Sequence, residues 1–269
     1  MGRDALNSTA HPEEPLSEAE VTSRRASTSQ WDATDYARFG GFVPALGEAA
    51  LDLLDPQPGE HILDVGCGDG SLTEKIVGRG ATVVGIDNSL SMVGAARSRG
   101  LDVRLMDAAE LKFAESFDAA FSNATLHWVL DKERAARAIW FALKFQGRFA
   151  GEFGGTGNLA RLREALDNEL VIRGYIPPIE AANWYPSVEE FADVYETAGF
   201  TGIDARLIER PTELEHGVEG WVMVFRAGWM ARAGAPEDEH PAIAAAVAAN
   251  LDTNIADYVR LRFMMRKPK

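Results

Sequence analysis

Between residues 61 and 153, short apolar runs alternate with segments of helical period, and this alternation constrains the fold more than any other feature. The apolar runs have the length of buried strands and cover residues 61–66, 81–89, 102–107, 117–123 and 147–153. Helical patterns lie between several of them, at residues 71–80, 91–100 and 131–143. Strands and helices that alternate at this spacing predict right-handed crossovers. The expected fold class is therefore α/β, with a doubly wound and mostly parallel sheet.

The second half of the chain departs from the alternation. Residues 158–200 have helical patterns on either side of a loop, "GYIPPIEAANWYPS". Two more strands are expected at residues 202–210 and 256–265, with two helices inserted between them. The first inserted helix carries Trp221, Phe225, Trp229 and Met230, and an aromatic stripe at helical spacing is more often packing than a substrate wall.

The chain divides into a tail and one domain. Residues 1–28 are rich in Ser, Thr, Glu and Pro, which predicts a disordered tail. Residues 29–269 are expected to form one domain. Its helical lid segments are expected at about residues 29–55, 158–190 and 212–252.

Charge and composition exclude several classes of protein. A net charge of −14 and a pI near 4.8 argue against a nucleic-acid partner and an anionic membrane surface. No apolar run reaches the roughly 20 residues of a membrane helix, and Cys67 is the only cysteine, so a cytoplasmic protein is expected. No His, Cys and Asp cluster has metal-ligand spacing, so no metal is expected. The basic residues near the C-terminus are interpreted as the solvated ends of a strand: Arg260, Arg262, Arg266, Lys267 and Lys269.

The glycine-rich turn "GCGDGS" follows the first apolar run and precedes a helix, as nucleotide-binding turns do. A dinucleotide turn requires a third glycine where this chain has Ser71, and Asp64 and Asp69 would repel a pyrophosphate. A nicotinamide-dependent oxidoreductase is therefore disfavoured. A Walker-type phosphate loop fails as well, because no Gly-Lys-Ser/Thr follows the turn.

The same acids suit S-adenosylmethionine, which carries an ammonium and a sulfonium group and no phosphate. Asp64 can meet the ammonium group, and Asp87 lies near the spacing of an acid that binds ribose hydroxyls. Asp107 can accept from the adenine amino group, and Asn123 ends the fourth run at the same edge of the sheet. Asp87 or Asp107 alone could equally cap a helix or turn. The joint arrangement favours cofactor binding.

With these segments in order, the chain resembles a class I S-adenosylmethionine-dependent methyltransferase. The resemblance rests on "LDVGCGDGSLT", "VVGIDNS", "MDAAEL" and "FDAAFSNATLHWV", and "SNATLHWV" with "EFGGTGN" is similar to the trans-aconitate methyltransferase-like group. It covers about Trp31 to Phe263 and implies a Rossmann-like sheet of seven strands whose last two form an antiparallel hairpin. It also implies that the residues 31–42, the loop at 175–186 and the late insertion form a lid.

The resemblance assigns roles to the site residues. It places Asp64, Gly66 and Gly68 at the methionine part of the cofactor, with Cys67 as a small filler in that turn. Asp87 would hold the ribose. The remaining cofactor contacts would come from Asn88, Met92, Asp107, Ala108, Asn123 and Ala124, with His127 at the entrance to the acceptor pocket.

The expected function is methyl transfer to a small molecule, at oxygen of a carboxylate or hydroxyl group, by in-line displacement. A carboxylate acceptor needs only a clamp, for which Arg38 and Arg226 are candidates, with Tyr36 as a further substrate contact. A hydroxyl acceptor needs a base, for which His127 is the candidate. Plainer interpretations remain: His127 as a packing or cofactor-lining residue, Arg38 and Arg226 as solvated helix charges, and Tyr36 as a cover of the cofactor. A methyltransferase-like protein that binds the cofactor without transferring a methyl group is the alternative function.

Overall fold

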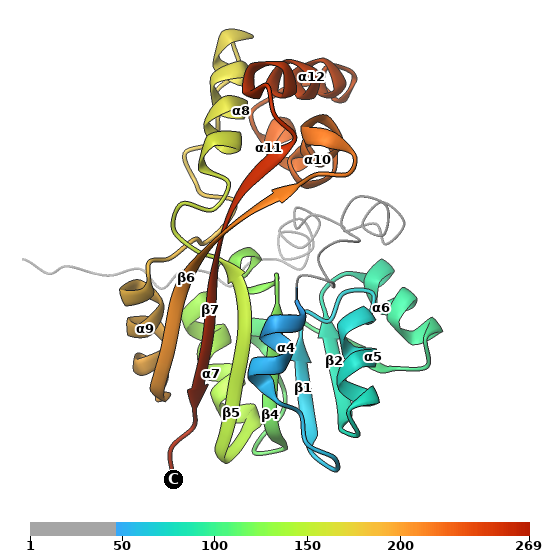
Figure 1. Ribbon diagram of the computed structural model, residues 1–269, viewed down its shortest axis with the longest axis vertical. Helices are drawn as coiled ribbons and strands as arrows, with labels where there is room; N and C mark the ends of the chain where they lie inside the picture. The colour runs from blue at the N-terminus through green and yellow to red at the C-terminus, as the bar shows by residue number, and fades with distance from the viewer. Residues whose placement is uncertain (1–46) are drawn as a thin grey trace, which may run out of the picture. The chain divides into compact units, whose positions relative to one another are not determined.

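The computed structural model describes residues 47–269 (Figure 1). The expected tail and the lid candidates Tyr36 and Arg38 lie outside the described residues. The first half contains these elements: α4 (Glu48–Leu54), β1 (His61–Val65), α5 (Ser71–Gly78), β2 (Thr82–Asp87), α6 (Leu90–Ser98), β3 (Asp102–Leu105), η1 (Ala108–Glu110), β4 (Phe117–Asn123), η2 (Leu126–Trp128), α7 (Lys132–Ala142) and β5 (Leu143–Gly154). The second half contains α8 (Ala160–Ile172), α9 (Val188–Thr197), β6 (Thr201–Glu213), α10 (Gly217–Phe225), α11 (Ala227–Arg232), η3 (Glu237–Glu239), α12 (His240–Leu251) and β7 (Ile255–Arg266).

The strands form one seven-stranded sheet in the order β3-β2-β1-β4-β5-β7-β6. The pairs among β1 to β5 are parallel, whereas β7 runs antiparallel to both β5 and β6. The order reverses between β1 and β4, which is the topological switch point of the sheet. The expected α/β class, the mostly parallel sheet and the C-terminal hairpin are confirmed.

Helices cover both faces of this sheet (Figure 1). On one face, α4 and α5 bury Leu51 and Ile76 in a cluster with Ile62 and Phe121 of the central strands. On the other face, α7 and α9 pack in a second cluster with Phe149, Phe263 and their neighbours. The central strands are apolar on both faces because both faces are covered.

The C-terminal strands are longer than the sequence predicts. β6 and β7 pair from Thr201↔Arg266 to Glu213↔Ile255, well past the end of β5. β5 also begins earlier than residue 147, because it follows α7 directly. Pairing with a neighbour, which no local pattern reveals, sets the length of these strands.

The far ends of β6 and β7 carry a helical lobe, which consists of α8, α10, α11 and α12. Its apolar cluster contains Trp221 and Met230 as buried residues, with Phe225 and Trp229 packed against it. The aromatic stripe is therefore packing, as expected. The first inserted helix, which was expected to be continuous, is in fact two helices, α10 and α11, that meet at Arg226.

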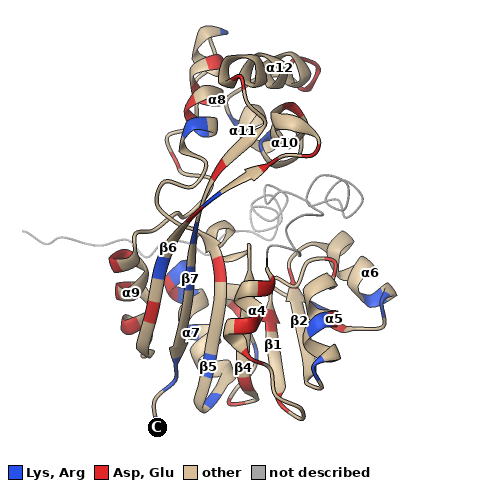
Figure 2. Ribbon diagram, viewed as in Figure 1, with Lys and Arg blue, Asp and Glu red and all other residues tan. Residues whose placement is uncertain are grey.

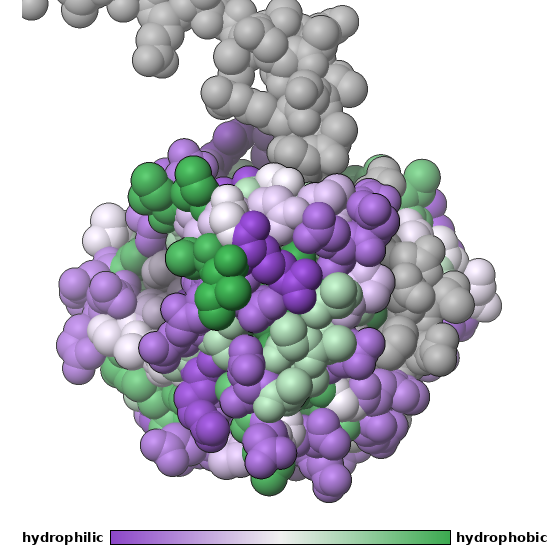
Figure 3. Space-filling view, turned by 90° about the horizontal axis from the view of Figure 1, so that it is seen from above, coloured by the Kyte–Doolittle hydropathy of each residue, from purple (hydrophilic) through white to green (hydrophobic). Residues whose placement is uncertain are grey.

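The lobe also exposes large apolar side chains near the end of α8 and in the loop that follows. These are Val171, Ile172, Ile176 and Ile179. Seen from above (Figure 3), hydrophobic residues lie in separate groups divided by hydrophilic ones, so this face is not one continuous apolar patch. None of the helices within residues 47–269 has the length and apolar composition that crossing a membrane requires.

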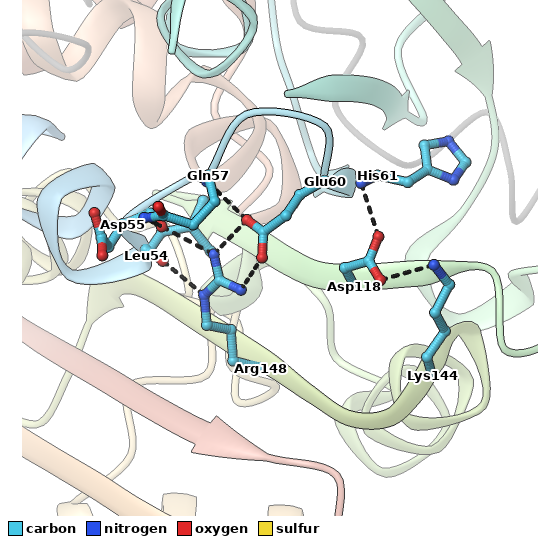
Figure 4. Close-up of polar contacts among 8 residues, drawn as sticks. All are labelled: Leu54, Asp55, Gln57, Glu60, His61, Asp118, Lys144 and Arg148. Carbon is cyan, nitrogen blue, oxygen red and sulfur yellow. Dashed lines mark hydrogen bonds and ion pairs between the residues drawn. The ribbon is translucent and has the colours of Figure 1, made fainter. Parts of the chain in front are cut away.

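A network of polar contacts holds together the amino-terminal edge of the parallel strands, opposite the edge at which the glycine turn lies (Figure 4). Arg148 of β5 binds both carboxylate oxygens of Glu60, at 2.6 and 2.7 Å, and donates to the backbone oxygen of Leu54. Beside it, Asp118 accepts from the backbone N–H of His61 and from Lys144. These contacts tie α4, β1, β4 and β5 at the edge remote from the glycine turn, so we assign them a structural role.

Candidate active site

The candidate site lies at the carboxyl-terminal edge of the sheet, where β1, β2, β3 and β4 end side by side. Open α/β sheets bind ligands at this edge, next to the switch point. The sequence-predicted acids and Asn123 come from the ends of these four strands. The topology therefore brings the predicted cofactor residues to one edge.

The glycine turn leaves β1 with two glycines in the left-handed region, at φ +74° for Gly66 and +57° for Gly68. A Cβ atom on Gly66 would lie 2.1 Å from the side chain of Thr125, so no larger residue fits there. A Cβ atom on Gly68 would meet no atom of residues 47–269 within 4 Å. Among these residues, nothing prevents a ligand from approaching the backbone of the turn closely at Gly68.

Asp87 braces this turn from the end of β2. Its Oδ2 atom accepts from the backbone N–H of Gly68 at 3.0 Å, and its Oδ1 atom accepts from that of Ser89 at 2.8 Å. The side chain is half-buried, and desolvation raises the pKa of its carboxyl group. Each carboxylate oxygen has a second lone pair, so Asp87 can still accept from a ligand hydroxyl.

Asp64 lies beneath the turn and is only 2% exposed. Its Oδ2 atom accepts from the hydroxyl of Thr73 in α5 at 2.6 Å. Burial raises the pKa of this carboxyl group to about 7, and the nearby Asp87 contributes to the rise. The site therefore contains a carboxyl group that changes charge near neutral pH.

The other predicted cofactor residues differ in exposure. Asp107 is exposed and caps η1 by accepting from the backbone N–H of Ala109. Asn88 is exposed, whereas Met92 is buried in α6. Cys67 packs with Val93, Ala96 and Val103, and burial raises the pKa of its thiol. Ala108 is also buried.

The loop after β4 is fastened to the glycine turn. Ala124 has φ +54° and donates its N–H to the backbone oxygen of Glu152 at 2.7 Å. The Thr125 hydroxyl donates to the backbone oxygen of Gly66 at 3.0 Å. Asn123 and Ala124 are therefore held beside the turn.

These residues fit S-adenosylmethionine better than a nucleotide with phosphates. The turn presents the backbone of Gly68, with no described atom against its Cα, an acceptor at Asp87 and a buried acid at Asp64. Its other acid, Asp69, is paired with Arg99 at 2.9 Å and so contributes less to the repulsion of a phosphate than the sequence suggested. Anions would be repelled by this set, whereas a cationic amino acid group and ribose hydroxyls would be bound. Residues 47–269 contain no group of three or more His, Cys, Asp or Glu side chains that could hold a metal ion.

His127 lies in η2, directly after this loop, and is 6% exposed. Its Nδ1 atom accepts from the backbone N–H of Gly154 at 3.2 Å, and its ring lies against Tyr185. Burial holds the pKa of His127 well below its ordinary value, and the charges of Arg260 and Arg226 lower it further. The ring is therefore neutral at physiological pH.

Arg226 comes to this place from the junction of α10 and α11, and it is 4% exposed. It donates to Asn183 Oδ1 at 3.0 Å and to the Tyr185 hydroxyl at 3.4 Å. Asn183 and Trp184 both donate to the backbone oxygen of His127. Arg226, the predicted substrate clamp that lies within the described residues, is thus next to His127.

Lys and Arg positions lie along β6 and β7 (Figure 2). The expectation of a strand with solvated ends is wrong for several of the C-terminal basic residues. Arg260 is 5% exposed and Lys267 is 1% exposed. The half-buried Arg262 binds Glu152 of β5 at 2.6 Å, and Arg210 of β6 binds it at 2.7 Å. Lys267 donates to the backbone oxygen of Leu143 and lies over the ring of Trp140. Contacts with neighbouring elements therefore bury what an isolated strand would expose.

Sequence reasoning did not find two arginines that lie near His127 and Tyr185, namely Arg260 and Arg163. Arg260 lies 4.0 Å from Glu152, over the ring of Tyr258. Arg163, in α8, lies over the ring of Tyr185. Alternation along β7 places Tyr258 and Arg260 on one face, and this pattern could have predicted from the sequence that the two side chains are neighbours. No local pattern in α8 distinguishes Arg163 from a solvated arginine.

Comparison with known proteins identifies the family. The family model of a methyltransferase domain matches residues 63–151. An uncharacterized methyltransferase from Schizosaccharomyces pombe is 35% identical over 208 residues, which cover 72% of this chain and 80% of that protein. The chain belongs to the class I S-adenosylmethionine-dependent methyltransferase family. The resemblance inferred from the sequence is confirmed, and S-adenosylmethionine is the cofactor of this methyltransferase.

A trans-aconitate 2-methyltransferase from Mycolicibacterium gilvum is 43% identical to this methyltransferase over 109 residues, or 37% of this chain. The match spans only 43% of that relative's length. Among solved structures, the phosphoethanolamine N-methyltransferase 2 of Haemonchus contortus in complex with S-adenosyl-L-methionine has a TM-score of 0.60 at 19% identity. That match covers 96% of this chain and 62% of the other, and it shows a shared fold.

Proposed function

We propose that this methyltransferase transfers the methyl group to a carboxylate oxygen of a small organic acid. The observation that supports this choice is the pair of buried arginines beside His127. The Nε atoms of Arg226 and Arg260 are buried and have no hydrogen-bond partner in the described part of the chain. An acid that enters beside the cofactor edge would supply the missing acceptor.

The energetic reason is that buried positive charge exceeds the negative charge beside it. Glu152 lies 4.0 Å from Arg260 but also binds Arg210 and Arg262, and the partners of Arg226 are the neutral Asn183 and Tyr185. Incompletely compensated buried charge is costly, and an anionic ligand offsets that cost. Arg226 lies over the ring of Trp221, at 5.7 Å between guanidinium carbon and ring centroid, and Arg260 lies over Tyr258 at 4.8 Å. A guanidinium group that rests on a ring keeps its planar edge available for a carboxylate. The same charges would repel an amine acceptor.

The chemistry requires little more than positioning. When bound, S-adenosylmethionine supplies a methyl group on a positively charged sulfur. A carboxylic acid, with a pKa near 4, is already ionised at neutral pH. The residues of the site then need to align the acid with the cofactor and exclude water, which can contribute roughly 7–11 kcal/mol.

For the cofactor, we propose contacts from the four strand ends. Asp64, Gly66 and Gly68 hold the methionine part, with Cys67 filling the turn, and Asp87 holds the ribose. The other contacts are Asn88, Met92, Asp107, Ala108, Asn123 and Ala124. The names of the relatives make trans-aconitate the first acid to try.

The test has two steps. Calorimetry with S-adenosylmethionine, and separately with NAD, on the wild type and Asp87→Ala establishes the cofactor: we expect binding of S-adenosylmethionine that Asp87→Ala weakens. Methyl transfer is then measured with trans-aconitate, other small acids and their primary amides. We expect methyl esters of acids and no reaction of the amides. Transfer to amines or phenols with no transfer to any acid would overturn the proposal.

A further inference from the structure

The hydrogen bond from Gly154 to His127 restricts what this histidine can do. A backbone N–H is always a donor, so Nδ1, which receives it at 3.2 Å, has no proton. In a neutral imidazole the proton must then be on Nε2. Both ring nitrogens of His127 are therefore occupied, Nδ1 by the hydrogen bond from the Gly154 N–H and Nε2 by its own proton. Neither nitrogen is left to take a proton from a substrate.

The surroundings of His127 keep this state in place. Trp184 and Asn183 donate to its backbone oxygen, and its ring contacts the rings of Trp128, Tyr185 and Phe153. The charged groups that face it are Arg260 from β7 and Arg226 from the lobe. Both disfavour an imidazolium ion.

We propose that His127 is a hydrogen-bond donor to the methyl acceptor through Nε2–H and not a general base. This inference rests on the proposed function and narrows it. Without a base at His127, the acceptor must arrive already ionised, so the site methylates carboxylic acids and does not methylate alcohols or phenols. The base role that the sequence suggested for a hydroxyl acceptor is thereby replaced.

The reaction balances without a proton transfer. A carboxylate oxygen forms the new bond to the methyl carbon, and the bond from that carbon to sulfur breaks with its electron pair remaining on sulfur. The positive charge of the sulfonium and the negative charge of the carboxylate disappear together. His127 Nε2–H, with Arg226 and Arg260, orients the acid and then holds a neutral ester, which binds the arginines more weakly.

The first experiment reads the ring directly and needs no substrate. Protein with ¹⁵N-labelled histidine is titrated from pH 5 to pH 8, and the His127 signals are assigned by their loss in His127→Gln. We expect a neutral ring with the proton on Nε2 that does not titrate in this range. A proton on Nδ1, or an imidazolium at pH 7, would overturn the proposal whatever the enzyme methylates.

The second experiment separates a donor from a base. His127→Gln keeps a side-chain N–H donor but cannot act as a base, and His127→Phe keeps an aromatic ring without a donor. With S-adenosylmethionine saturating, we expect His127→Gln to stay within about fivefold of the wild-type kcat/KM for the acid. We expect His127→Phe to raise the KM for the acid about 10- to 100-fold.

A base predicts a different pattern. Both variants would then lose roughly 10²- to 10⁴-fold in kcat, and the wild-type rate would rise with pH along the titration of the base. That outcome, or methylation of a phenol at a rate similar to the acid, would overturn the proposal. If the NMR result is as expected but no acid is methylated, the proposed function fails and the state of His127 stands.

Discussion

At the scale of single residues, Asp64 shows how burial alone gives a common side chain an unusual property. It is 2% exposed with one hydroxyl partner, Thr73, and burial raises its pKa from 3.8 to about 7. Ionisation in the folded state is therefore unfavourable. The destabilisation is absent below pH 4, grows as the pH rises and is complete above pH 7.

We expect Asp64→Asn to remove this pH dependence. At about 1.4 kcal/mol per pH unit between the two pKa values, the wild type should lose roughly 2–3 kcal/mol more stability than the variant between pH 5 and pH 8. Urea unfolding of the cofactor-free protein at both pH values measures the difference. Parallel curves for the two proteins would show that Asp64 has an ordinary pKa.

The same titration should appear in cofactor binding. The ammonium group of S-adenosylmethionine favours the ionised Asp64, so we expect wild-type affinity to rise from pH 6 to pH 8. Asp64→Asn should bind more weakly at pH 8 and lose the rise. Calorimetry at the two pH values tests this, and an affinity that is equally pH-dependent in the variant contradicts it.

Arg226 is the residue on which substrate affinity should depend. We expect Arg226→Gln to raise the KM for an acid by about 10- to 100-fold, because the variant loses a charged hydrogen bond. S-adenosylmethionine affinity should change little. Arg232→Gln is the matched control, because Arg232 is an exposed arginine of α11. Equal KM values in the two variants would remove Arg226 from the acceptor site.

At the scale of elements, the glycine turn combines two requirements that mutation can separate. Gly66 has a positive φ, and a Cβ atom there would lie 2.1 Å from Thr125, whereas Gly68 has a positive φ and no described atom within 4 Å of such a Cβ. Gly94, in α6, has an ordinary φ and likewise no described atom within 4 Å. Of these three positions, Gly66 and Gly68 require glycine, for different reasons, and Gly94 does not.

We expect a graded series of alanine variants. Gly66→Ala should be strongly destabilised through its clash with Thr125. Gly68→Ala should lose about 1 kcal/mol from backbone strain and most of its cofactor affinity, because its methyl enters the ligand space. Gly94→Ala should gain about 0.5–1 kcal/mol. Thermal unfolding measures the stability of each variant, and calorimetry measures its affinity for S-adenosylmethionine. Unchanged affinity in Gly68→Ala would contradict the placement of the cofactor against Gly68.

At the scale of the whole molecule, the β6–β7 hairpin joins the described sheet to the helical lobe. Its inner half pairs with β5, and its outer half carries the lobe. Glu152 binds Arg262 and Arg210 and lies 4.0 Å from Arg260, so one buried carboxylate connects three strands. Sheet and lobe should therefore lose structure together.

We expect Glu152→Gln to cost about 3–5 kcal/mol, because it leaves buried arginines without their carboxylate. Glu209→Gln, at an exposed position of β6, is the control and should stay within about 0.5 kcal/mol of the wild type. Unfolding followed by circular dichroism and by tryptophan fluorescence should give coincident curves. A separate unfolding transition of the lobe would contradict the expectation that sheet and lobe unfold together.

Local patterns in the chain were enough to determine the fold class and the cofactor family. Strand and helix periods depend on neighbouring residues, and the turn from Gly66 to Gly68 with Asp87 behind it occupies two adjacent strand ends. For the same reason, the local pattern predicted the first five strands in their order along the chain. Boundaries were less accurate where strands pair beyond their local pattern, as at the ends of β6 and β7.

Only the tertiary structure decided how the acceptor side is built. Arg163, Arg226 and Arg260 look like ordinary solvated charges in the sequence, because a main partner of each lies far away along the chain: Tyr185, Asn183 and Glu152, respectively. Arg226 meets Asn183 and Tyr185, more than forty positions away in each case, and His127 receives its defining hydrogen bond from Gly154. Burial and charge of such side chains depend on contacts between distant segments, and packing of the lobe on the hairpin creates those contacts.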